Sequence, residues 1–87
     1  MKILELKDVV RKDFPIYYRR LYSGMAVIEL LNKSVESALA FQIETKPAGD
    51  TEVTITSLEE VDYPLLPLKK ELKKFIGELD STGSLPD

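Results

Sequence analysis

The chain has 87 residues, of which 44% are hydrophobic and 31% are charged, and its net charge is −3. This composition is typical of a globular domain and excludes a disordered or fibrous chain. The chain has no Cys and no His, which excludes a disulfide framework, and no catalytic, metal-binding or phosphate-binding motif is present. We expect one domain over residues 1–80, followed by a mobile tail over residues 81–87.

The N-terminal residues do not form a signal peptide, because Glu5 and Asp8 interrupt the apolar residues there. No segment approaches membrane-spanning length, so we expect no membrane partner. A small domain without cysteine is typical of a reducing compartment, and we expect a cytoplasmic protein. Charge is unevenly distributed, with an excess of basic residues over residues 1–24 and of acidic residues over residues 25–62.

The first 13 residues allow two interpretations. Ile3, Leu6 and Val10 have the spacing of one helix face, whereas the run Ile3-Leu4-Glu5-Leu6 also suits the start of a strand. We favour a short helix for this N-terminal element.

Two strands are predicted next, over residues 16–22 and 25–31, because both segments are rich in aromatic and branched residues. Ser23-Gly24 separates them as a weak hairpin signal. The polar stretch 32–34 connects the second strand to a third. Because short connections favour sequential neighbours, we predict an antiparallel meander of four strands, completed by the hairpin described next.

The clearest local signal is the segment Lys46–Asp50, which is flanked by alternating apolar residues on both sides. Pro47 suits the first central position of a turn, and Gly49 suits the left-handed position of a three-residue hairpin loop. This loop places Lys46 opposite Asp50.

The same register places Phe41 opposite Ile55 on the core face and Glu44 opposite Glu52 on the other face. Like charges that face each other across a ladder are unfavourable. Either a cation lies between these two carboxylates or the register is wrong.

An amphipathic helix of about 14 residues is predicted after the last strand. Pro64 and Pro67 fit only its first turn, Asp62 is the expected cap, and Gly83 is the expected terminator. The predicted fold class is therefore α+β, with the helix packed on one face of the sheet. Its apolar stripe consists of Leu65, Leu68, Leu72, Phe75, Ile76 and Leu79.

A basic, tyrosine-rich segment is the first candidate site. Aromatic rings on a strand, with guanidinium groups between them, have the chemistry to stack bases and contact phosphates. Cross-strand packing and cation–π contacts explain the same residues, and we favour this structural interpretation because the chain is acidic overall. The candidate nucleic-acid surface consists of Arg11, Lys12, Tyr18, Arg19, Arg20 and Tyr22.

The predicted strand 25–31 has apolar residues at both odd and even positions, although a helix is expected to cover only one face of the sheet. The second face is covered either by the N-terminal segment or by a partner, and the sequence fits both equally. The candidate protein interface consists of Met25, Val27 and Leu31.

The acidic residues are the last candidate, because paired carboxylates can act in acid–base chemistry or hold a hard cation. Their spacing does not match a calcium loop, and we assign no catalytic residue, no metal and no cofactor. We expect a small non-enzymatic interaction or accessory module that binds another protein or itself. The alternative is a weak nucleic-acid-binding domain.

Overall fold

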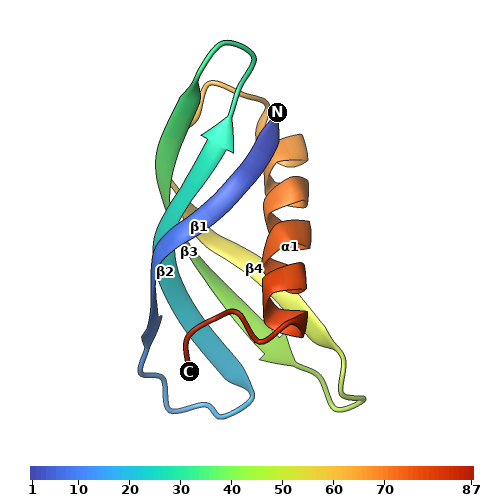
Figure 1. Cartoon of the computed structure of the whole chain (residues 1–87). Helices are drawn as coiled ribbons and strands as arrows, with labels where there is room; N and C mark the ends of the chain where they lie inside the picture. Colours follow the sequence, from blue (N-terminus) through green and yellow to red (C-terminus); the bar gives the residue numbers. More distant parts are fainter.

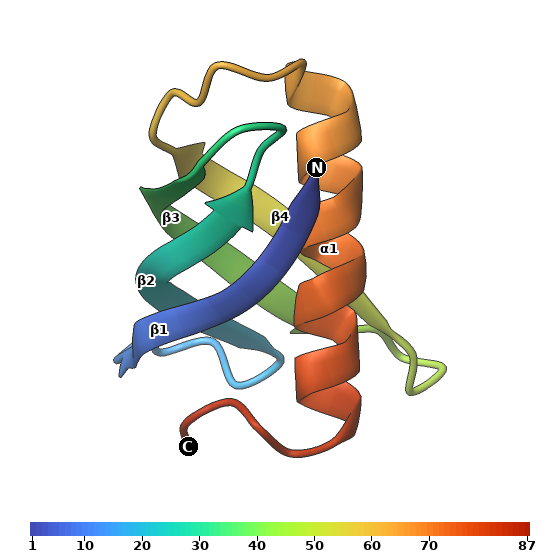
Figure 2. The same ribbon diagram turned by 45° about the horizontal axis from the view of Figure 1, so that its top comes forward.

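The computed structural model describes residues 1–87, and it confirms the α+β class (Figure 1). Four antiparallel strands form one open sheet in the order β1-β2-β3-β4, which is the predicted meander. A single helix, α1, lies across one face of this sheet (Figure 2). The elements are β1 Lys2–Lys12, β2 Arg19–Glu29, β3 Ser34–Thr45, β4 Thr51–Leu58 and α1 Leu65–Ser81.

The N-terminal element is a strand, so the predicted helix is wrong. β1 pairs with β2 but is interrupted by two bulges, one after Ile3 and one after Lys7. Within the second bulge, Asp8 has a φ of 54°, a left-handed conformation that Asp tolerates better than most residues. Each bulge adds one residue, and the apolar residues that pack on the core are therefore Ile3, Leu6 and Val9. A bulged strand has here imitated the three-residue spacing of a helix.

The predicted turn at Ser23-Gly24 is also wrong, because β2 continues straight through it. β2 pairs without interruption with β3, from Arg19 opposite Glu44 to Glu29 opposite Ser34. The single strand therefore replaces the two predicted at residues 16–22 and 25–31, and β1 supplies the fourth strand of the meander.

Gly24 is required by the close approach of β1. An added Cβ at Gly24 lies 3.1 Å from Val9 Cγ2 and 3.2 Å from the carbonyl oxygen of Lys7. We expect Gly24→Ala to lower the free energy of unfolding by about 1 to 3 kcal/mol, because the bulge must move to admit the methyl group.

The matched control is Gly77→Ala, where an added Cβ meets nothing within 4 Å. Removing a glycine from a helix interior raises stability by up to about 1 kcal/mol. Urea denaturation of the two variants measures both changes. A Gly24→Ala protein as stable as the parent would contradict the close contact between β1 and β2.

The predicted hairpin is confirmed. Lys46 N–H donates to the carbonyl oxygen of Asp50 at 2.8 Å, and Gly49 has a φ of 96°. The register places Phe41 opposite Ile55, and Glu44 opposite Glu52, as expected. The sequence pattern and the loop chemistry together fix this register.

α1 is longer than predicted, with 17 residues, and begins after Pro64 rather than at a cap formed by Asp62. Leu68, Leu72 and Ile76 are its buried residues, whereas Leu65 is 53% exposed. Leu65 was therefore wrongly assigned to the core. Its position at the start of the helix lies beyond the part of α1 that contacts the sheet.

The core lies between α1 and the facing side of the sheet. The backbone of α1 approaches β1 and β4, the two edge strands, and side chains of the central strands fill the space between. The Tyr22 ring stacks on Phe41, with centroids 5.1 Å apart. The buried apolar residues are Ile3, Tyr22, Ala26, Ile28, Leu39, Phe41, Ile43, Ile55, Leu68, Leu72 and Ile76.

The helix ends at Gly83, as predicted. Gly83 has a φ of 70° and donates its N–H to Asp80 O, while Ser84 donates to Leu79 O. These two bonds form a Schellman motif, which satisfies carbonyl groups at the end of the helix. Beyond it the chain folds back, and Leu85 packs against the core. The last residues thus contribute to the packing of the domain.

Candidate functional site

The face of the sheet opposite α1 is open (Figures 1 and 2). β1 lies beside β2 at the edge of the sheet, so it does not cover this face. Residues opposite each other in the ladder share a face, and alternation from buried Tyr22 identifies those that point to the open side. Six apolar residues in the middle of this face form what we call the open-face patch: Val10, Leu21, Met25, Val27, Ala38 and Ala40.

The structure places two of the three predicted interface residues in this patch. Met25 and Val27 are neighbours on the open face of β2, and both are half-buried by the side chains around them. Leu31 lies in the turn after β2 and is 95% exposed, so it is outside the patch. The strand ends at Glu29, two residues earlier than predicted, and this removes Leu31 from the ladder.

The sequence analysis missed the other members of the patch. Val10 was assigned to a helix, and Ala38 and Ala40 were not considered because alanine is a weak strand signal. The register of β3 was nevertheless readable from the hairpin. It already placed Ala38 and Ala40 on the face opposite Leu39 and Phe41.

Ion pairs border the open-face patch on two sides. Lys7 Nζ donates to Glu36 Oε2 at 2.6 Å, across the intervening β2 strand. This hydrogen bond to Glu36 raises the pKa of Lys7. At the other end, Arg19 Nε lies 3.3 Å from Glu44 Oε1. The apolar centre is thus framed by paired charges.

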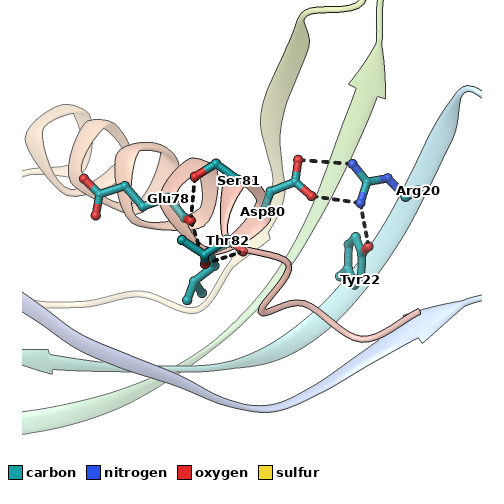
Figure 3. A network of polar contacts seen from close by, with 7 residues as sticks. Arg20, Tyr22, Glu78, Asp80, Ser81 and Thr82 are labelled. Carbon is teal, nitrogen blue, oxygen red and sulfur yellow. Dashed lines mark hydrogen bonds and ion pairs between the residues drawn. The ribbon is translucent and has the colours of Figure 1, made fainter.

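Arg20 and Tyr22 belong to the opposite face of the sheet and point toward α1 (Figure 3). Arg20 Nη1 donates to Asp80 Oδ1 at 2.9 Å and to Tyr22 Oη at 3.1 Å, and Arg20 Nη2 donates to Asp80 Oδ2 at 3.2 Å. The bond to Asp80 and, secondarily, the bond to Tyr22 raise the pKa of Arg20. With Tyr22 1% exposed, these two residues connect β2 to the end of α1 and are not available to a nucleic acid.

The remaining members of the predicted nucleic-acid surface are divided between two places. Arg11, Lys12 and Arg19 line a hollow of about 220 Å³, together with Asp13 and Asp87, which offset most of their charge. Tyr18 lies on the other side of Arg19, whose guanidinium carbon is 5.6 Å from the centre of the Tyr18 ring. The six residues therefore do not form one continuous basic and aromatic surface.

The facing carboxylates Glu44 and Glu52 each have their own cation. Arg19 pairs with Glu44, and Lys46 Nζ lies 3.2 Å from Glu52 Oε2. Side chains of the protein thus provide the cations that the register required. No three acidic side chains lie close enough together to hold a metal ion.

A hollow of about 660 Å³ lies at the end of the sheet beside the β3–β4 loop. Its charged lining residues are Glu44 and Lys46, and both are held in the ion pairs just described. The other lining residues are Tyr17, Tyr18, Thr45 and Pro47. This arrangement offers no free acid and base facing each other across the hollow.

No helix of the structure is long and apolar enough to cross a membrane. Among comparisons with known proteins, the model of the BB_0187 family matches residues 1–81, which include the whole sheet and α1. No curated protein and no solved structure matches the chain.

Proposed function

The chain belongs to the family whose model matches residues 1–81, and we propose that it is a non-enzymatic interaction module that binds a second copy of itself through the open-face patch. The observation that carries this proposal is the apolar middle of a sheet face that no element of the chain covers. Apolar area on an open sheet face gains free energy when a partner removes it from water.

The size of the face supports a second copy as the partner. Strands about 4.8 Å apart, with a rise of about 3.3 Å per residue, give four strands of 8 to 12 residues a face of roughly 500 to 750 Å². Specific dimers bury about 800 Å² per partner. Two such faces packed together form a four-layer arrangement, with a helix on each outer side.

The charge of the face also supports a second copy. Four basic and five acidic residues point to the open side, so the face is nearly neutral although the chain carries −3. A neutral face does not repel its own copy, and it offers little attraction to a polyanion such as a nucleic acid. These residues are Lys2, Lys7, Lys12, Arg19, Glu5, Glu29, Glu36, Glu44 and Glu52.

The test is a double variant, Met25→Glu with Val27→Lys, that keeps the net charge. Met25 lies opposite Lys7, and Val27 lies opposite Glu5 and Glu36, so each new charge meets an opposite charge within the same sheet. We expect the monomer to stay folded and self-association to be lost. Sedimentation equilibrium should give about twice 9.9 kDa for the parent and 9.9 kDa for the variant.

The control is Leu31→Glu with Leu66→Lys, which makes the same charge changes at residues that are 95% and 80% exposed and lie away from the patch. This control should associate like the parent. A parent protein that remains monomeric into the millimolar range contradicts self-association. Association that survives the Met25 and Val27 changes contradicts the assignment to the open-face patch.

A further inference from the structure

The outer edge of β4 has backbone groups without partners. Lys46 and Asp50 form a hydrogen-bonded pair at the hairpin, and hydrogen-bonded and non-hydrogen-bonded pairs alternate along an antiparallel ladder. The N–H and C=O groups of Thr51 and Val53 are therefore directed away from β3. They lie at an edge that no other strand covers.

The two edges of the sheet differ in how they are protected. Edge strands are commonly blocked by lysine, proline or bulges. β1 has three lysines and two bulges, one of which contains the left-handed Asp8. Residues 51–55 of β4 contain no lysine, no proline and no bulge. Only the β4 edge is thus ready to accept another strand.

A groove of about 610 Å³ runs along this edge, between β4 and α1. Lys73 and Lys74 lie on its helix side. The acidic residue in the groove, Glu52, is paired with Lys46. The groove therefore has an excess of positive charge, although the chain as a whole is acidic.

Gly77 also lines this groove. Glycine inside a helix costs about 1 kcal/mol relative to alanine. Packing does not require it, because an added Cβ meets nothing within 4 Å, and its φ is not positive. What the missing side chain does provide is open space beside the free edge of β4.

We propose that this groove binds an extended acidic segment of a partner protein, which adds to the sheet as a fifth strand beside β4. The backbone of the segment pairs with Thr51 and Val53, and its carboxylates lie over Lys73 and Lys74. Strand addition of this kind takes affinity from main-chain hydrogen bonds and specificity from alternate side chains. The surface is separate from the open-face patch, so the two proposals stand or fall independently.

The test is an NMR titration of labelled full-length protein with a blocked hexapeptide of alternating Thr and Glu, at low salt. We expect amide shifts at Thr51, Val53, Lys73 and Lys74, and slower hydrogen exchange of the Val53 N–H at saturation. A hexapeptide of alternating Thr and Lys is the matched probe and should give no shifts there. Absence of shifts with the acidic peptide, or equal shifts with both peptides, overturns the proposal.

Two variants locate the site without threatening the fold. Gly77→Leu fills the groove with a good helix former, so we expect an unchanged or higher Tm and at least tenfold weaker peptide binding. Lys73→Glu should weaken binding similarly, whereas Lys33→Glu, the same charge change in the β2–β3 turn, should not. Parent-like affinity of Gly77→Leu overturns the groove as the binding site, and equal losses for Lys73→Glu and Lys33→Glu reduce the effect to net charge.

Discussion

Replacing Leu72 with Ala is expected to lower the free energy of unfolding by about 2 to 5 kcal/mol. The Leu72 side chain is completely buried between α1 and the sheet, with Leu68 and Ile76 on the same side of the helix. Removing it forfeits buried apolar contact and leaves a cavity that the neighbouring strands cannot fully close. The measurement is urea denaturation followed by circular dichroism. For a domain of 87 residues, a loss of this size is a large fraction of the total stability.

The control is Leu65→Ala in the same helix. Leu65 belongs to the predicted apolar stripe but is 53% exposed, so its replacement should change the free energy of unfolding by no more than about 0.5 kcal/mol. The pair of variants measures how α1 is rotated on the sheet. Equal losses at the two positions would mean that the first turn of the helix also packs on the core.

The second large effect is expected at the contact between β2 and the end of α1. Asp80→Asn should cost about 1 to 3 kcal/mol, because Arg20 loses its charged partner in a place where only 25% of its side chain is exposed. Asp80 lies in the last turn of α1, where a carboxylate is unfavourable next to the negative end of the helix. Its pairing with Arg20 is therefore what makes this residue acceptable there.

Glu78→Gln is the matched control, because Glu78 is exposed in the same part of the helix and its carboxylate is in no ion pair with another residue. This change should be close to neutral. A double-mutant cycle with Arg20→Gln and Asp80→Asn then isolates the pair. A coupling energy near zero would show that the bidentate contact contributes nothing to stability in solution.

The sequence predicted best where one local feature determined the geometry. The segment Lys46–Asp50 combines a turn-forming proline, a glycine in the left-handed region and apolar alternation on both sides, and the register followed from these alone. The stripe of α1 was likewise correct at Leu68, Leu72 and Ile76. In both cases the deciding contacts are set by spacing along the chain.

The sequence failed where one strand changes the meaning of another. The bulges of β1 give Ile3, Leu6 and Val9 a helical spacing, and their cause, the contact with Gly24 of β2, is not visible locally. Gly24 in turn resembled a turn residue because its real role is to admit that bulge. Neither error can be corrected without knowing that β1 and β2 are neighbours.

The candidate site shows the same limit. Met25 and Val27 were identified because apolar residues at both parities of one strand are a local signal. Arg20 and Tyr22 were assigned to an exposed surface because their alternation was read correctly but their face was not. Which face α1 covers is decided by the whole sheet, and it places Tyr22 in the core.

The order of elements along the chain has a consequence for synthesis. α1 provides Leu68, Leu72 and Ile76 to the core, and it is the last element to be made. All four strands are complete at Leu58, which is 18 residues before Ile76. At about 5 to 20 residues per second, the ribosome leaves the nascent sheet without its helix for roughly 1 to 4 s. During this interval both sheet faces are unprotected, and a co-translational chaperone has its opportunity to bind.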